Sequence, residues 1–541
     1  MHTRLLCFCI FVPALMGAAQ EPPHAGHERL GTVHFASSCN QQAQSELDHA
    51  VALLHSFEFG NAIASFRAVL SSDASCGVAY WGIALSDWSN PFASGLKDTR
   101  QLQAGRAAVE SGEKTGAKTA RERDYLAAVA ALYAQNVSQR ERLIAYRDRM
   151  AALAAKYPSD HEAQIFYALA IAASEDPADK TYAGRLKAGA MLEKLFEQEP
   201  DHPGIAHYII HTYDVPALAP QALKAAQRYA AIAPDAPHAL HMPSHIFTRL
   251  GDWQDSITSN VAAAAAARRQ GETAEELHAS DYLMYAYLQT AQDEAARRVL
   301  DALPQTASRF DPKKLIGGAA SPSAAYFALA AIPARHALER GDWKQAARLQ
   351  PSESPFPYTQ AITWFARGLG LARLGESEPA DEAADQLKNI HAQLLKSGEN
   401  YWALQVHIQE TEVRAWAALA KGRKDEALDT MASAVTLEDG TEKSAVTPGP
   451  LAPAHELYGD MLLQTGQPAL ALAQFELSLK KEPGRFRSLY GAGHSAQLAG
   501  RSDLQQRYFR ALLASCEHGD PSGRVELAEA KSVMVTPTSH P

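Results

Sequence analysis

Apolar residues recur at helical spacing over almost the whole chain, and no alternating pattern reaches a convincing strand length. The clearest unit reads YGDMLLQTGQPALALAQFELSLKKEP, where Gly466 separates two short amphipathic stretches. In this unit Gly459 is a small residue of the first stretch and Phe475 a large residue of the second. Gly493 and Phe509 repeat both positions 34 residues later. The pattern therefore predicts helical hairpins that recur with a fixed period.

A period of 34 residues is that of the tetratricopeptide repeat. In that repeat a small residue lets the second helix lie on the first, and an aromatic residue fills the gap to the next unit. Degenerate copies of the arrangement occur at Gly422 with Ala427, Gly341 with Trp343, Gly251 with Trp253, and Phe59 with Phe66. We therefore predict an all-α fold, an α-solenoid in the form of a right-handed superhelix of about eight degenerate tetratricopeptide-like hairpins.

Two interruptions divide this array. The stretch LPQTASRFDPKKLIGGAASPS, residues 303–323, is predicted to link an N-terminal solenoid of residues 38–302 to a C-terminal solenoid of residues 324–515. A tail, residues 516–541, follows. The stretch LEDGTEKSAVTPGPLAP, residues 437–453, lengthens the connection between two otherwise regular units. It is interpreted as a surface loop, and a lid over a groove is the alternative.

The N-terminus has the features of a signal peptide over residues 1–19. Arg4 precedes the apolar run LLCFCIFVPALM, and the small residues Gly17 and Ala19 precede the expected cleavage point. The run is too short to span a bilayer, and no later segment approaches transmembrane length. We expect an exported protein, periplasmic or secreted, with no membrane span after signal cleavage. Residues 20–37 are expected to form an extended lead-in.

The composition and the net charge argue against a disordered chain and against a nucleic-acid-binding protein. Hydrophobic residues make up 46% and charged residues 21%, which is typical of a folded chain rather than a disordered one. The formal net charge of −10 and the lack of any Lys/Arg-rich run argue against a nucleic acid partner.

Three of the five cysteines remain after the signal is removed. Cys39 precedes and Cys76 follows the first predicted hairpin, so the two can form a disulfide in an oxidising compartment. Three buried thiols are equally compatible with the spacing. Cys516 is left unpaired in either case.

Five histidines fall into two groups within a stretch that runs from His202 to Trp253. The first group is His207 and His211, and the second is His238, His241 and His245. The groups are in register, because His207 precedes His241, and His211 precedes His245, by 34 residues. A helical step of about 100° per residue places each group on one face of its helix, and Asp214 on the face of the first group. In tetratricopeptide register these faces line the concave groove.

A histidine taken by itself is more often a hydrogen-bonded core residue than a ligand, but two consecutive repeats with the same placement favour a metal site. The predicted ligands are His207, His211, Asp214, His238, His241 and His245. Imidazoles favour zinc or copper, with iron possible, and a single carboxylate disfavours calcium and magnesium. Six donors exceed the need of one tetrahedral ion, which leaves either a second ion or a residue that acts as acid or base. Pro243 is predicted to kink or restart the second histidine helix.

Three further sets are weaker candidates. They are His278 with Asp281, as second-sphere partners or added ligands; His55 with Trp81 and Trp88, as a groove floor or as ordinary packing; and Glu412 with Trp416, as peptide contacts.

Several stretches together resemble a family of exported bacterial tetratricopeptide-repeat proteins. They are CNQQAQSELDHAVALLHSFEFGNAIASFRAVL, GVAYWGIALS, HPGIAHYIIHTYD, APHALHMPSHIFTRLGDW and VTPGPLAPAHELYGDMLL, of which HMPSHIFTRLGDW is the most distinctive. The resemblance implies the repeat fold and export. It implies no catalytic residue.

Two kinds of function fit these features. The first is an exported metal-binding or interaction protein whose concave groove takes a protein, a peptide or a small molecule. The alternative is a metal-dependent enzyme, a hydrolase or an oxidoreductase, with the groove as active site. The sequence contains no Gly-rich phosphate loop, no Gly-x-Ser-x-Gly elbow and no His-Glu-x-x-His motif.

Overall fold

The computed structural model describes residues 28–313, 318–521 and 523–535, and throughout these ranges the secondary structure is helical, without a β-strand. The predicted all-α solenoid of helical hairpins is confirmed. The predicted signal peptide lies outside the described residues.

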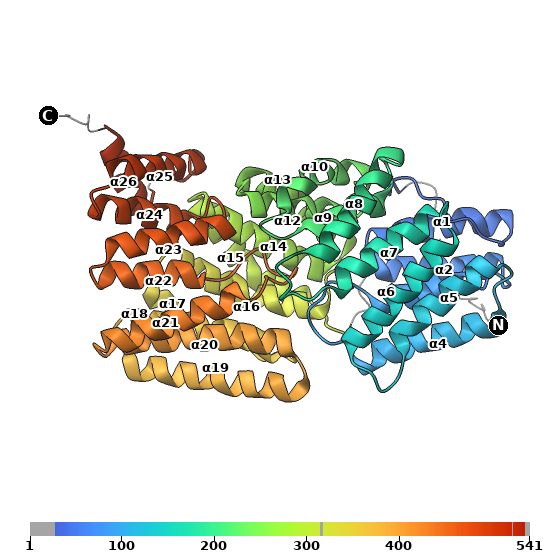
Figure 1. Ribbon diagram of the computed structural model, residues 1–541, viewed down its shortest axis with the longest axis horizontal. Helices are drawn as coiled ribbons and strands as arrows, with labels where there is room; N and C mark the ends of the chain where they lie inside the picture. The colour runs from blue at the N-terminus through green and yellow to red at the C-terminus, as the bar shows by residue number, and fades with distance from the viewer. Residues whose placement is uncertain (1–27, 314–317, 522, 536–541) are drawn as a thin grey trace, which may run out of the picture.

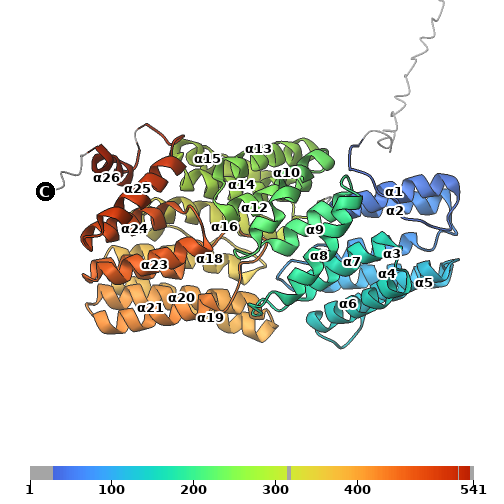
Figure 2. The ribbon, with the colours of Figure 1, turned by 45° about the horizontal axis from the view of Figure 1, so that its top comes forward.

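The helices fall into three groups along the long axis of the molecule (Figures 1 and 2). At one end are α1 (Gln41–His55), α2 (Phe59–Ser72), α3 (Ala79–Trp88), α4 (Thr99–Thr115), α5 (Ala120–Ala130), η1 (Ala131–Tyr133), α6 (Gln139–Lys156), α7 (His161–Ser174) and α8 (Ala183–Gln198). The middle consists of α9 (Pro203–Tyr213), η2 (Ala219–Ala222), α10 (Leu223–Ile232), α11 (Pro237–His241), α12 (Pro243–Leu250), α13 (Trp253–Gln270), α14 (Thr273–Gln289), α15 (Asp293–Arg309) and α16 (Pro322–Glu339). The other end consists of α17 (Trp343–Ala347), α18 (Pro357–Arg373), α19 (Ser377–Ser397), α20 (Asn400–Ala420), α21 (Lys424–Asp439), α22 (Ala454–Gln464), α23 (Pro468–Lys481), α24 (Phe486–Leu498), α25 (Ser502–Ser515) and α26 (Val525–Val535).

Contacts between glycine and phenylalanine explain why the hairpins stack with a fixed period. The Phe475 ring of α23 packs on Gly459 of α22 and on Gly491 of α24, and it leaves no room for a Cβ at either glycine. Phe509 of α25 packs on Gly493 of α24 in the same way. One aromatic ring thus fills the gap within its own hairpin and the gap to the next one, as the spacing predicts.

The predicted linker, residues 303–323, is partly helical. α15 continues to Arg309, because the apolar positions of its amphipathic face extend beyond residue 302 and Pro304 is accommodated inside the helix. α14 and α16 pack directly on each other on either side of the linker. Ala319 and Ala320 of the segment are buried, and Ala320 belongs to the apolar cluster between α14 and α16. In the predicted tail, α26 packs on α25 and buries Leu527 and Ala530.

The described part of the N-terminal lead-in, from Glu28 to Ala36, forms neither a helix nor a strand. The Phe35 ring stacks on Trp81 with centroids 4.8 Å apart, and the Cys39–Cys76 disulfide follows. Of the two alternatives for these cysteines, the disulfide is therefore the one found. Cys516 is a buried free thiol. None of the helices in the described ranges is both long enough and apolar enough to cross a membrane.

Candidate metal centre

Six buried histidines from four helices form one layer in the middle of the molecule. We call His207 and His211 of α9, His238 and His241 of α11, His245 of α12 and His278 of α14 the histidine layer. None of the six is more than 7% exposed. The structure thus brings together all five predicted histidines and adds His278, one of the weaker candidates.

The predicted interruption at Pro243 is present. α11 ends at His241 and α12 begins at Pro243, because proline has no amide hydrogen to continue the helical ladder. Met242 between them keeps helical dihedrals. The backbone therefore continues along a helical path although the ladder of helical hydrogen bonds is interrupted. His241 and His245 therefore still lie on one face.

The layer divides into two sets of three. The candidate ligand atoms of His207, His211 and His238 lie within 4.8 Å of one another, and so do those of His241, His245 and His278. We call these sets the first trio and the second trio. The six predicted donors therefore do not converge on one point.

In the second trio, hydrogen bonds determine which ring nitrogen of His241 and of His245 carries the hydrogen. His241 donates from Nδ1 to Oδ1 of Asn260 (2.7 Å), and Asn260 is oriented by its own Nδ2, which donates to the Ser256 carbonyl (2.8 Å). His245 donates from Nδ1 to Oδ2 of Asp214 (2.9 Å). Both acceptors are oxygens without hydrogen, so each neutral ring has a lone pair on Nε2. The two Nε2 atoms face each other at 3.1 Å.

In the first trio, one nitrogen of His207 has a partner and four other nitrogens have none. His207 donates from Nδ1 to the carbonyl of His55 (2.7 Å). Within the described part of the chain, Nε2 of His207, Nε2 of His211 and both ring nitrogens of His238 are buried without a hydrogen-bond partner. Two rings pack around them: Phe57, whose φ is +58°, lies edge-on to His207 (4.3 Å), and Phe92 stacks on His211 (4.3 Å).

Burial favours the neutral form of five imidazoles of the layer: His207, His211, His241, His245 and His278. It lowers the pKa of His245 to about 4, although Asp214 opposes the shift, and that of His278 to about 3, although Glu275 opposes it. Burial, followed by the neighbouring imidazoles, lowers the pKa of His207, His211 and His241 well below the usual value. Neutral imidazole is the form that binds a metal ion.

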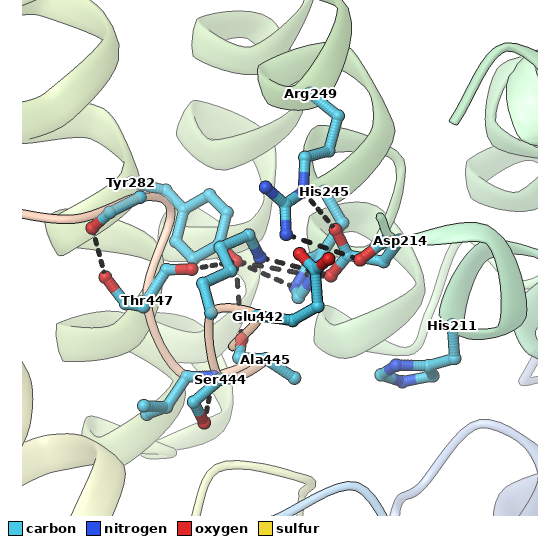
Figure 3. A network of polar contacts seen from close by, with 12 residues as sticks. His211, Asp214, His245, Arg249, Tyr282, Glu442, Ser444, Ala445 and Thr447 are labelled. Atoms are coloured by element: carbon cyan, nitrogen blue, oxygen red, sulfur yellow. Dashed lines mark hydrogen bonds and ion pairs between the residues drawn. The ribbon is translucent and has the colours of Figure 1, made fainter. Parts of the chain in front are cut away.

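Asp214 is placed differently from the prediction. It caps the end of α9, and both its carboxylate oxygens are occupied: Oδ2 accepts from His245 and from Nζ of Lys443 (3.2 Å), and Oδ1 accepts from Nε of Arg249 (3.0 Å) (Figure 3). Burial acts to raise the pKa of Asp214, but Lys443 and Arg249 outweigh it and hold the pKa well below its usual value. Asp214 therefore orients His245 from behind and does not face the Nε2 atoms.

The segment between α21 and α22, residues 440–453, lies against the histidine layer and is not the surface loop that we favoured. The Tyr282 hydroxyl lies 3.3 Å from the carbonyls of Ala445 and Thr447 and 3.2 Å from Nε2 of His245 (Figure 3). Ser444 meets Ser94, from the loop that carries Phe92, at 2.9 Å. The alternative interpretation, a lid, describes this placement.

Buried Arg335 holds the same segment and also corrects the role predicted for Asp281. It donates from Nε to Oδ1 of Asp281 (2.8 Å) and from Nη2 to Oγ1 of Thr447 (2.6 Å) and the carbonyl of Gly449 (3.0 Å). Asp281 is thus paired with Arg335 and is not a partner of His278.

In a second histidine cluster, hydrogen bonds within the protein satisfy every ring nitrogen. The two oxygens of Glu162 accept from Nε2 of His55 (2.9 Å) and Nε2 of His202 (3.1 Å). The other nitrogens accept in turn, at His55 from the Tyr208 hydroxyl (3.0 Å) and at His202 from the Ile205 amide (3.4 Å). Every ring nitrogen has a partner, so this cluster needs no ion.

The remaining weak candidates are core residues. Trp81 and Trp88 are fully buried among the N-terminal helices, as in the packing alternative. Glu412 is 1% and Trp416 2% exposed, so neither presents a surface to a peptide. In this part of α20 the predicted register fails because the helix is covered by neighbours on both sides.

Three functional candidates carried little or no signal in the sequence. Asn260 directly precedes the run VAAAAAA. A lone amide side chain at this point of an alanine-rich helix is a weak signal of a specific role. Tyr282 lies one turn after His278 on α14, and its ring contacts all three rings of the second trio. Glu58 follows α1 far from any histidine motif, and only the fold brings it to His238.

A cavity of about 540 Å³ lies next to the layer. Its lining includes Arg249 and Lys443, which both contact Asp214, and the stacked pair Tyr358 and Trp402, whose centroids are 4.0 Å apart. The lining contains no histidine of the layer, so a molecule bound there would contact Arg249 and Lys443, and these contact Asp214 in turn.

No protein-family model and no curated protein sequence matches this chain. Among solved structures, it is similar to a tetratricopeptide repeat protein from Parabacteroides merdae (14% identity, TM-score 0.27, covering 55% of this chain and 98% of that one). It is also similar to human IFIT1 in a dimer with m7Gppp-AAAA (11% identity, TM-score 0.35, covering 88% and 96%). A third is the Naa15/Naa10 structure bound to HypK-THB (12% identity, TM-score 0.24, covering 91% and 72%). The architecture described above follows from the chain's own helices.

Proposed function

We propose that this chain is an exported helical-repeat protein that binds a transition metal, zinc or copper, in its histidine layer. One observation carries the proposal: Nε2 of His241 and Nε2 of His245 face each other at 3.1 Å with a lone pair on each. Two lone pairs repel at this distance unless a cation lies between them. The nearby Tyr282 hydroxyl has one hydrogen and satisfies at most one of the two nitrogens.

The spacing of the two nitrogens suits a metal ion. An ion at the usual zinc–nitrogen distance of about 2.0 to 2.1 Å from both would form an N–metal–N angle of about 100°, near the tetrahedral value. His278 supplies the third nitrogen of the second trio. Asn260 and Asp214 hold the two rings from behind, which is the usual second-sphere arrangement around metal-binding histidines.

The test is elemental analysis of protein purified through its own export route. The variant His211→Ala/His245→Ala removes one imidazole from each trio and is expected to lose tightly bound metal. His161→Ala/His494→Ala, which removes two histidines bonded to glutamates outside the layer, is the control and should keep it. Unchanged metal content and affinity in His211→Ala/His245→Ala, with helicity intact by circular dichroism, would contradict the proposal.

A metal-dependent hydrolase or oxidoreductase is the second candidate, and the cavity beside the layer favours it. Three imidazoles leave a tetrahedral ion one open position for water or substrate. The cavity supplies room for a small molecule or a peptide end next to Arg249 and Lys443, the two residues that contact Asp214. Turnover of ester, phosphoester and phenol substrates by metal-loaded protein, and its loss after chelation, separates this candidate from metal binding alone.

A further inference from the structure

The first trio concentrates unsatisfied nitrogen on three neighbouring rings of the described core. Four ring nitrogens on His207, His211 and His238 are buried without a hydrogen-bond partner within the described ranges. Leaving a buried acceptor or donor unpaired carries the full cost of removing that group from water. The contrast with Glu162 and its two histidines is direct, because there every nitrogen is paired within the same kind of helical core.

The hydrogen bond from His207 to the backbone carbonyl of His55 leaves one of these nitrogens able to bind a metal ion. The carbonyl of His55 accepts only, so Nδ1 of His207 carries the hydrogen and Nε2 has a lone pair. One ring nitrogen of His207 lies within 4.8 Å of one ring nitrogen of His211 and one of His238. The first trio therefore resembles the second in two respects: its candidate ligand atoms lie close together, and one of its rings, His207, is oriented by a hydrogen bond that leaves a lone pair on Nε2.

The two trios adjoin each other. Ring centroids of His211 and His245 are 5.9 Å apart, and those of His238 and His241 are also 5.9 Å apart. Pairs within a trio span a similar range, from 4.5 Å for His241 and His278 to 6.5 Å for His245 and His278. Since an ion lies about 3 Å from the centroid of a ring that binds it, ions in the two trios would be at most about 12 Å apart.

Two buried carboxyl groups lie near the first trio. Glu275 lies 3.9 Å from Nδ1 of His238. Glu58 is 2% exposed and follows Phe57, whose ring stacks on His238 with centroids 5.7 Å apart, and neither of its oxygens has a hydrogen-bond partner among the described residues. Burial raises the pKa of Glu58 well above its usual value. A buried acid without a partner is costly to ionise, and a nearby cation lowers this cost.

We infer that the first trio holds a second transition-metal ion and that the two trios form one dinuclear centre. The inference rests on the proposed function, since it needs the layer to bind metal at all. Each ion would take three imidazole nitrogens from the chain. Water or hydroxide would fill the remaining coordination positions of each ion.

The first experiment counts ions in the full-length protein. Protein stripped with a chelator is titrated with Cu²⁺ alone and with Zn²⁺ alone, and bound metal is measured after desalting. We expect two ions per chain, one ion in His207→Ala, one ion in His278→Ala, and none in the double variant. His207→Gln and His278→Gln serve as less disruptive replacements if an alanine variant loses helicity.

The second experiment asks whether the ions sense each other. Electron paramagnetic resonance of the Cu²⁺ protein is expected to show a signal that is broadened or lost through spin coupling, whereas His207→Ala and His278→Ala each show a sharp signal from one isolated ion. One ion per wild-type chain, or two ions with unperturbed signals, overturns the dinuclear centre while metal binding stands. No bound ion in the wild-type chain overturns the proposed function as well.

Discussion

Asn260 determines which ring nitrogen of His241 faces the other two histidines of the second trio. Its Nδ2 donates to the Ser256 carbonyl, so its Oδ1 is the atom that meets Nδ1 of His241. A single amide thereby selects the ring tautomer with a lone pair on Nε2. Asp214 selects the same tautomer of His245, and its acceptor is a charged carboxylate.

Replacing Asn260 by leucine should weaken metal binding about 10- to 100-fold, the usual cost of losing a second-sphere partner of a metal-binding histidine. Competition with a chromophoric chelator measures the affinity. Gln474→Leu is the matched control, because Gln474 accepts from Nδ1 of His455 (2.7 Å) outside the layer. Equal affinities in the two variants would show that Asn260 has no special role.

The free energy of unfolding of the metal-free protein should fall in mild acid. Burial lowers the pKa of His245 to about 4 and of His278 to about 3, against about 6.5 in an unfolded chain. Between these values the unfolded chain holds protons that the folded chain does not. Stability therefore decreases as pH falls below 6.5, by about 1.4 kcal/mol per pH unit for each group, and these two groups add no dependence above it.

Urea denaturation at pH 7 and at pH 5 measures this loss. The variant His245→Gln/His278→Gln should show a smaller difference between the two pH values, because its side chains do not titrate. The same difference in both proteins would contradict the assignment.

At the scale of elements, one buried ion pair anchors segment 440–453 to α14 and α16. Arg335 and Asp281 are both fully buried. Replacing Arg335 by methionine leaves Asp281 as an uncompensated buried charge, which should cost about 3 to 5 kcal/mol in urea denaturation. Arg335→Met/Asp281→Leu should recover much of this loss. Arg297→Met, which breaks the exposed pair with Asp301, should cost under about 1 kcal/mol.

The disulfide joins the start of α1 to the approach to α3. It closes a loop over a sequence separation of 37, so loop entropy predicts a stabilisation of about 4 kcal/mol. Cys39→Ala/Cys76→Ala should lower the free energy of unfolding by this amount, and reduction of the wild-type protein should do the same. Cys516→Ala, which removes a free thiol, is the control; a loss of equal size there would point to cysteine packing instead.

The repeat architecture could be predicted because its decisive contacts are local in sequence. Phe475 meets glycines of its own hairpin and of the next one, so a period of 34 residues is enough to find them. His207, His211, His241 and His245 belong to the same periodic pattern, and for this reason their grouping could also be predicted.

The parts of the site that escaped prediction depend on distant segments. Lys443 meets Asp214 across a separation of 229 residues, and no periodicity links the two. The division into two trios depends on where α14 places His278 relative to α12, which the sequence pattern does not specify. Glu58 reaches His238 through the stacking of non-adjacent helices.

At the scale of the whole molecule, export remains a prediction. The apolar run and the small residues of 1–19 predict cleavage, so mass spectrometry of the protein recovered from its native host should show a first residue near Gln20. The Cys39–Cys76 disulfide suits an oxidising compartment. A mature chain that begins at Met1 would refute this prediction.

If the layer binds metal as proposed, segment 440–453 should govern how long an ion stays bound. Its carbonyls lie against Tyr282, whose ring contacts the second trio, and its Lys443 lies against Asp214. An ion that can depart only after this segment moves would be released at a rate limited by that motion. Above a modest concentration, more chelator should therefore not strip the protein any faster.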